Sequence, residues 1–138
     1  MPIEQIDPKD ARNLLDDTPG SLYIDVRTPE EFANGHPDGA LNIPIFLKQN
    51  GQMVPNVDNF KKVVETVLPK NDVLIVGCQA GGRSQTACEL MAQWGFNTLY
   101  NVRGGFGSWQ RSGLPVSTEA NDDIVYDELL AKADAVSR

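Results

Sequence analysis

The sequence predicts an α/β domain in which helices flank both faces of a central parallel sheet of about five strands, with an extra helix at the C-terminus. Short apolar runs alternate with helix-like segments along the chain, which is the pattern of strands connected by helical crossovers. The run Val73–Val76 is apolar at every position, as in a strand covered on both faces in the middle of a parallel sheet. With 138 residues and 41% hydrophobic side chains, the chain suits one domain with one core.

Turn-forming residues mark the first helix and the first clear strand. Asp7 is a candidate N-cap, because Pro8 then occupies the first helical position, where no N–H partner is needed. Pro19-Gly20 ends this helix. Residues 21–26 form a short apolar strand that ends near Asp25.

A second, short helix follows that strand. Thr28 and Glu31 have the spacing of a capping box, in which each side chain bonds the backbone N–H of the other residue. Gly35 ends the helix, and residues 41–44 predict a brief strand.

The second half of the chain repeats this alternation. After a turn at Asn50-Gly51, the predicted elements are a helix at 57–68, a strand at 73–76, a helix at 86–94, a strand at 98–102 and a short helix from Gly104-Gly105 through Trp109. Pro115 closes the main domain, which is expected to comprise residues 1–116.

Residues 117–138 are predicted to be an acidic linker followed by a helix at 124–136. From Thr118 onward there are six acidic and two basic side chains, so this segment carries −4 of the net charge of −7. Two interpretations remain open. Either the segment faces a partner, or its helix folds back on the domain as a solvated surface helix.

Composition argues against several classes of function. A net charge of −7 disfavours nucleic acid as the main partner, because a phosphate-binding surface needs basic side chains. No apolar run approaches the roughly 20 residues of a membrane helix, so no membrane partner is predicted. The start at Met1-Pro2 leads into no basic and apolar leader, and two cysteines without a pairing motif favour a reducing cytoplasm. No cofactor is predicted.

Cys78 lies where the strand at 73–76 gives way to a glycine-bearing loop and a helix. This geometry points several backbone N–H groups and the positive end of a helix dipole at one place. A cysteine there is expected to be largely thiolate, which is the reactive form. The alternative is a buried structural cysteine, but such a residue needs no glycines behind it, so Cys78 is the predicted nucleophile. The predicted substrate-binding residues are Gln79, Ala80, Gly81, Gly82, Arg83 and Ser84.

More specific roles are predicted for two residues of this loop and for one residue outside it. Arg83 is predicted to bind an anionic substrate beside the sulfur, since the guanidinium fork suits oxyanions; a solvated or structural arginine is the alternative. Ser84 is a candidate N-cap of the next helix. Arg103 follows the end of another strand and is a candidate for a second positive side chain at the opening of the Cys78 site. A position on the protein surface, away from the site, agrees equally well with the sequence.

Other reactive residues are assigned to the scaffold. His36, the only histidine, lies in a Gly/Pro-rich turn and is expected to fix that loop rather than form a Cys–His dyad. Arg27 and Glu31 are expected to pair at the strand–helix junction, and Asp25 to border the site at the carboxyl end of its strand. Cys88, on the apolar face of a helix, is expected to be a packed core thiol rather than a resolving cysteine. One histidine and two separated cysteines predict no metal site.

Four segments, taken in order, resemble those of single-domain rhodaneses, the thiosulfate sulfurtransferase-type family. Each segment is weak alone, but four in order make a specific match that spans about residues 3–116. They are Ile24–Arg27 with Pro29–Phe32, Gly35–Pro44, Cys78–Ser84, and Gly104-Gly105 with Trp109.

The resemblance implies a parallel sheet flanked by helices and a persulfide mechanism. The Cys78 thiolate is then expected to attack the outer sulfur of a donor such as thiosulfate, releasing sulfite. The sulfur passes on to cyanide, a dithiol, glutathione or a protein thiol. Backbone N–H groups of the loop stabilise the persulfide charge, and Arg83, with Arg103 as a weaker candidate, orients the donor anion.

The length of the loop separates two kinds of chemistry. From Cys78 to Arg83 there are six residues, and related phosphatases of the same architecture use a loop one residue longer. The shorter loop favours sulfur over phosphate. A phosphatase or arsenate reductase that uses the same thiolate, and a non-enzymatic binding or sensing module, remain the alternatives.

Overall fold

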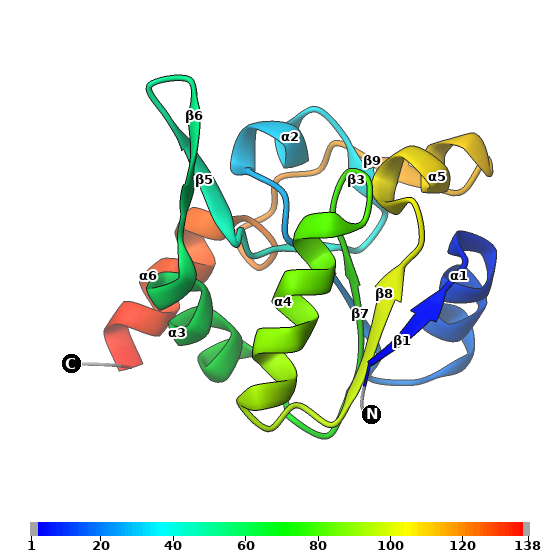
Figure 1. Ribbon diagram of the computed structural model, residues 1–138, viewed down its shortest axis with the longest axis horizontal. Helices are drawn as coiled ribbons and strands as arrows, with labels where there is room; N and C mark the ends of the chain where they lie inside the picture. The colour runs from blue at the N-terminus through cyan, green and yellow to red at the C-terminus, as the bar shows by residue number, and fades with distance from the viewer. Residues whose placement is uncertain (1–2, 137–138) are drawn as a thin grey trace.

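The computed structural model describes residues 3–136 (Figure 1), so the expectations that involve Met1-Pro2 and Arg138 lie outside the described residues. The elements in chain order are β1 (Ile3–Ile6), α1 (Pro8–Asp17), β2 (Leu22–Asp25), α2 (Pro29–Ala33), β3 (His36–Pro37), β4 (Leu41–Asn42), β5 (Phe46–Gln49), β6 (Gln52–Pro55), α3 (Val57–Val67), β7 (Val73–Gly77), α4 (Gly82–Gln93), β8 (Thr98–Val102), α5 (Gly105–Arg111), β9 (Val116–Ser117) and α6 (Tyr126–Val136).

Five strands form one parallel sheet in the order β1-β8-β7-β2-β4. The apolar strand β7 is central and pairs with β8 on one side and β2 on the other. Because these strands run in the same direction, their carboxyl ends meet at one edge, where ligand sites of such sheets lie. The predicted α/β class with a central parallel sheet is confirmed.

Alternate side chains of the central strand serve two different cores. Leu74 and Val76 belong to the core cluster that contains buried residues of α3, α4 and α6, whereas Ile75 belongs to the cluster with α1 and α5. This alternation is the period of two that a strand imposes. Figure 1 shows α3 and α6 on one side of the strands and α1 and α5 on the other. The continuous apolar run is therefore explained by burial on both faces.

The caps of the first two helices follow the sequence closely. Asp7 is the N-cap residue of α1, with Pro8 behind it, although its side chain makes no capping hydrogen bond. Thr28 and Glu31 form the predicted capping box: the Thr28 hydroxyl accepts the Glu31 N–H at 3.2 Å, and Glu31 accepts the Thr28 N–H at 3.1 Å. Four residues at the start of α2 thus fix the path of the chain as it leaves β2.

Two small sheets were not predicted from the sequence. The turn at Asn50-Gly51 is the tip of an antiparallel hairpin of β5 and β6, and both turn residues have positive φ, 52° and 77°, as a type I′ turn requires. Figure 1 shows this hairpin projecting away from the sheet. The second small sheet pairs β3 with β9, which joins His36 to Ser117.

The C-terminal helix is part of the core. Tyr126, Leu129 and Ala133 of α6 are buried in the same cluster as α3, and Lys62 of α3 lies 2.9 Å from Asp134 of α6. Of the two interpretations left open by the sequence, the structure shows a helix folded back on the domain, with its apolar side in the core.

Candidate functional site

The cysteine loop lies at the carboxyl edge of the sheet, between β7 and α4. Cys78 directly follows Gly77, the last residue of β7, and α4 begins at Gly82. The start of this helix was expected at Thr86, so it begins four residues early. Gly81 precedes the helix with a φ of 113°, a conformation that side-chain-bearing residues rarely adopt. This glycine lets the chain turn from strand to helix within a very short loop.

Ser84 does not cap α4, because it lies inside the first turn of the helix and Gly81 is the N-cap residue. The prediction of Ser84 as N-cap was therefore wrong. Its Oγ instead lies beside the loop, 3.4 Å from the Cys78 sulfur and 3.2 Å from the Gly81 carbonyl oxygen. The early start of the helix is what moves Ser84 from the cap position to the sulfur.

The start of α5 supports the cysteine loop. The Phe106 N–H donates to the Cys78 carbonyl at 2.7 Å, and the Gly107 N–H donates to the Gln79 carbonyl at 3.1 Å. Gly105 passes so close to the loop that a Cβ there would collide with the Cys78 carbonyl oxygen. The second glycine of Gly104-Gly105 is thus needed for packing α5 onto the loop, and this role was not predicted from the sequence.

The Cys78 sulfur is almost enclosed and accepts hydrogen bonds from the loop. Cys78 is 2% exposed, and the Gly81 N–H lies 3.0 Å from its Sγ. Burial raises the pKa of the Cys78 thiol, but the hydroxyl and N–H of Ser84 and the N–H groups of Gly81 and Ala80 lower it by more. The pKa therefore lies below its ordinary value, which favours the thiolate.

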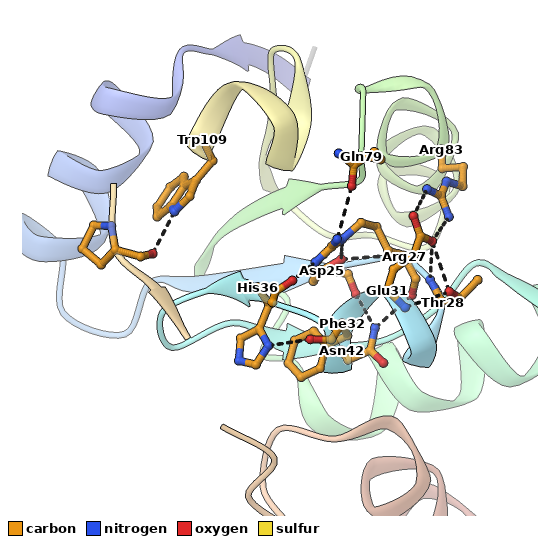
Figure 2. Close-up of polar contacts among 12 residues, drawn as sticks. Asp25, Arg27, Thr28, Glu31, Phe32, His36, Asn42, Gln79, Arg83 and Trp109 are labelled. Atoms are coloured by element: carbon orange, nitrogen blue, oxygen red, sulfur yellow. Dashed lines mark hydrogen bonds and ion pairs between the residues drawn. The ribbon is translucent and has the colours of Figure 1, made fainter. Parts of the chain in front are cut away.

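Arg83 is held in a two-pronged ion pair with Glu31 of α2 (Figure 2). Its Nη1 lies 2.7 Å from Oε1 and its Nη2 lies 3.0 Å from Oε2. Burial raises the pKa of Glu31, but hydrogen bonds from Arg83 and Thr28, together with the Arg83 charge, lower it to about 2. The positive charge of Arg83, which was expected to bind a substrate anion, is therefore already balanced by the carboxylate of Glu31.

Arg27 pairs with Asp25, so the predicted pair between Arg27 and Glu31 was wrong. The Arg27 Nε lies 3.0 Å from Oδ1 of Asp25 and the Nη2 lies 2.7 Å from Oδ2. Both side chains are buried, at 3% and 1% exposure. Side chains two positions apart in extended chain point to the same face, which brings this pair together at the end of β2.

The Arg27 guanidinium also joins three other segments of the site, and Figure 2 shows its contact with Gln79. It donates to the Gly35 carbonyl at 2.7 Å and to Oε1 of Gln79 at 3.3 Å, and it lies 4.2 Å above the centre of the Phe106 ring. One buried cation thus ties β2, the segment after α2, the cysteine loop and α5 to one another.

Arg103 is a surface residue. Its Nη1 lies 3.2 Å from Oδ1 of Asp7, and the two side chains are 60% and 59% exposed. Of the two positions that the sequence allowed for Arg103, the structure shows the one on the surface. Its guanidinium pairs there with Asp7, the N-cap residue of α1.

His36 is buried and anchored to α2. Its Nδ1 lies 2.9 Å from the Phe32 carbonyl oxygen, which only accepts, so Nδ1 carries the proton. The imidazole also stacks on the Phe32 ring at a centroid distance of 3.7 Å. This arrangement fixes the turn after α2 and shows no bond to Cys78.

Cys88 and Cys78 are both free thiols, but their surroundings differ. Cys88 is fully buried on α4, and its burial, with smaller effects of Glu89 and Cys78, raises its pKa to about 12. Cys88 therefore stays protonated and unreactive at neutral pH.

A shallow cavity of about 260 Å³ opens beside the loop. Three of its lining side chains, Asn34, Gln79 and Gln110, are neutral amides, and only Gln79 was predicted from the sequence. Asn34 and Gln110 lie at the ends of short helices and carry no sequence signal of their own. The full lining is Arg27, Glu31, Asn34, Gly35, Gln79, Phe106 and Gln110.

Within residues 3–136, no group of three or more histidine, cysteine, aspartate or glutamate side chains is placed to hold a metal ion. Over the same residues, no helix has the length and apolar character needed to cross a membrane.

A sequence model of the rhodanese-like domain matches residues 7–112, which includes β2, the cysteine loop and α5. The chain belongs to the rhodanese-like domain family. Its resemblance to the family, noted on four short segments, is thereby confirmed over most of the chain.

Relatives of this rhodanese-like chain include proteins named as sulfurtransferases. The chain is 42% identical over 96 residues to thiosulfate sulfurtransferase 16, chloroplastic, of Arabidopsis thaliana, covering 70% of this chain and 79% of that protein. It is 30% identical over 114 residues to thiosulfate sulfurtransferase GlpE of Actinobacillus pleuropneumoniae, covering 83% and 93%. A plant relative and a bacterial relative therefore both support the membership of this chain in the family.

Solved structures of the same fold agree with the architecture. Rv0390 from M. tuberculosis superposes with a TM-score of 0.71 at 27% identity, covering 83% of this chain and 97% of that chain. A rhodanese-related protein from Thermoplasma volcanium has a TM-score of 0.67 at 28% identity, covering 84% and 99%.

Proposed function

We propose that this rhodanese-domain protein is a sulfurtransferase in which Cys78 carries sulfane sulfur as a persulfide. The observation that carries the proposal is the Cys78 sulfur itself, which accepts the Gly81 N–H at 3.0 Å and has a lowered pKa at the end of a buried strand. A thiolate held by backbone N–H groups is a nucleophile that needs no general base. Relatives named as thiosulfate sulfurtransferases support the same reaction.

In the first step, the Cys78 thiolate attacks the outer sulfur of the donor. With thiosulfate, a bond forms between Sγ and that sulfur, the sulfur–sulfur bond of the donor breaks, and its electron pair leaves with sulfite. The negative charge then resides on the outer sulfur of the persulfide. The proposed binding surface is the loop Gln79, Ala80, Gly81, Gly82, Arg83 and Ser84, whose N–H groups are available to that charge.

In the second step, a thiophilic acceptor attacks the outer sulfur. Cyanide leaves as thiocyanate, and the Cys78 thiolate is restored with its electron pair. A thiol acceptor in its thiolate form takes the sulfur as its own persulfide by the same exchange. The proposed partners are thus a small-molecule sulfur donor and a thiol acceptor, either small or carried by a protein.

Replacing Glu31 with glutamine is expected to lower the KM for thiosulfate about fivefold, the equivalent of about 1 kcal/mol for a partly exposed ion pair. Glutamine preserves the capping box with Thr28 but removes the charge that compensates Arg83. Initial rates at constant ionic strength give the KM. Glu30→Gln is the matched control, since the Arg83 bonds go to Glu31. A KM that stays unchanged in Glu31→Gln means that Arg83 does not hold the donor.

The direct test of the proposed function is cyanide-dependent formation of thiocyanate from thiosulfate by the purified protein. We expect turnover that depends on both substrates and saturates with thiosulfate. Hydrolysis of an aryl phosphate without any sulfur transfer would instead assign the thiolate to phosphate chemistry. Absence of turnover with thiosulfate and with organic persulfides would support a binding or sensing module.

Arsenate reduction is a second candidate for the same thiolate. The chain is 40% identical over 112 residues to the protein HIGH ARSENIC CONTENT 1, mitochondrial, of Arabidopsis thaliana, and it covers 64% of that protein. Reduction of arsenate to arsenite takes two electrons, which two thiols supply by forming a disulfide. Arsenite production from arsenate and glutathione, at a rate above that of thiocyanate formation, would favour this function.

A cytoplasmic location and the absence of a cofactor stay predictions. The location rests on the two free cysteines, which a reducing compartment preserves. Relatives named as chloroplastic and mitochondrial show that the family also works elsewhere.

A further inference from the structure

Asn101 of β8 bonds the start of α4, which runs alongside this strand (Figure 1). The residue is 4% exposed. Its amide nitrogen donates to Oε1 of Gln5 at 2.9 Å, to Oε1 of Gln85 at 3.1 Å and to the Gly81 carbonyl at 3.4 Å. A backbone carbonyl only accepts, so the nitrogen must face it, and the amide oxygen Oδ1 therefore faces Ser84.

Ser84 has one hydroxyl proton and three acceptors within reach. Its Oγ lies 2.5 Å from Oδ1 of Asn101, 3.2 Å from the Gly81 carbonyl oxygen and 3.4 Å from the Cys78 sulfur. The contact with Asn101 is the shortest, and Oδ1 has no proton of its own, so the hydroxyl proton lies in this contact. The sulfur receives that proton only if Asn101 loses it.

We propose that Asn101 is a positioning residue that directs the Ser84 hydroxyl away from Cys78 and thereby limits the thiolate. In the thiol form, the Ser84 oxygen accepts the S–H of Cys78 while it donates to Asn101. When the thiol releases its proton to solvent, the hydroxyl turns to the sulfur and leaves a buried amide oxygen without a donor. That loss affects the thiolate state alone.

The competition between Asn101 and the Cys78 sulfur for the Ser84 hydroxyl proton also favours the persulfide form of Cys78 over its thiolate. In the persulfide, the negative charge lies on the outer sulfur, so Sγ no longer needs the hydroxyl proton and Ser84 returns to Asn101. Asn101 thus destabilises the empty thiolate relative to the persulfide. This consequence rests on the proposed sulfurtransferase function, whereas the effect on the ionisation of Cys78 does not.

Among the described residues, three other titratable groups interact with Cys78. They are Arg83 and Cys88 on α4 and Tyr23 on β2. The variants below leave all three in place, so a change in the ionisation of Cys78 reports on the hydroxyl of Ser84.

The experiment measures the rate of alkylation of Cys78 by iodoacetamide between about pH 5 and pH 10, which gives its pKa. Asn101→Leu removes the competing oxygen and is expected to lower this pKa by about half a unit to one unit, the equivalent of about one hydrogen bond. In a Ser84→Ala background, Asn101→Leu is expected to leave the pKa unchanged. Cys78→Ser gives the background reaction of Cys88.

A merely structural role of Asn101 predicts the opposite sign. Loosening the loop would weaken the N–H bonds to the sulfur, so Asn101→Leu would raise the pKa of Cys78, with or without Ser84. Either a rise or an equal shift in the Ser84→Ala background overturns the proposal. If the leucine variant does not fold, Asn101→Val, whose β-branched side chain suits a strand, is judged by the same outcomes. Because alkylation needs no sulfur donor, failure of the sulfurtransferase assay leaves this result intact.

Discussion

Cys78→Ser is expected to reduce thiocyanate formation from thiosulfate and cyanide by roughly 10³-fold or more, since a serine hydroxyl does not ionise at neutral pH. Serine is close to cysteine in size, so the loop should keep its shape around position 78. Steady-state rates, with circular dichroism as a check of folding, make the measurement.

The matched control replaces the other cysteine, Cys88, with alanine. Cys88 is fully buried and protonated, so Cys88→Ala should keep the turnover number within about twofold while lowering the free energy of unfolding slightly. If thiocyanate forms at the same rate in Cys78→Ser, Cys78 takes no part in the reaction.

Arg27→Met is expected to destabilise the fold by about 3–5 kcal/mol, because it leaves the Asp25 carboxylate buried without its partner. Methionine fills much of the volume but replaces none of the hydrogen bonds to Asp25, Gly35 and Gln79. Thermal unfolding should show a fall in Tm of roughly 10 to 20 °C.

Arg12→Met is the control for this substitution. Arg12 pairs with Asp16 on the surface of α1, with 27% and 50% exposure, and an exposed pair of this kind contributes about 0.5 kcal/mol or less. Replacing both Asp25 and Arg27 by apolar residues should restore part of the loss, since no buried charge is then left unpaired. Equal small effects of Arg27→Met and Arg12→Met would show that the buried pair does not hold the site together.

Features encoded by neighbouring residues were predictable from the sequence. The capping box of Thr28 and Glu31 depends on a spacing of three residues, and the position of Cys78 depends on an apolar run followed by glycines. Both are local patterns with a physical meaning that needs no knowledge of the tertiary fold.

Ion pairs of the site were not predictable in the same way. Glu31 and Arg83 are 52 residues apart, and only the tertiary fold decides that they meet. Glu31 was assigned instead to the nearest arginine in the chain, Arg27, which the structure pairs with Asp25. Local proximity is a weak guide where several carboxylates and guanidinium groups converge at one sheet edge.

Residues that contact the cysteine loop from outside it were missed for the same reason. Asn101 lies 17 residues from Ser84 in the chain, and an asparagine in a strand has no chemical signature. The contact of Gly105 with the Cys78 carbonyl also depends on how α5 packs. Glycine pairs after a strand are a usable signal for such close approach, whereas single amides are not.

The most direct test of the account is the mass of the peptide that contains Cys78 after incubation of the protein with thiosulfate alone. We predict a gain of about 32 Da, one sulfur atom, that is lost on addition of cyanide and is absent from the peptide that contains Cys88. Turnover of thiosulfate with no such gain on the Cys78 peptide would contradict the persulfide mechanism.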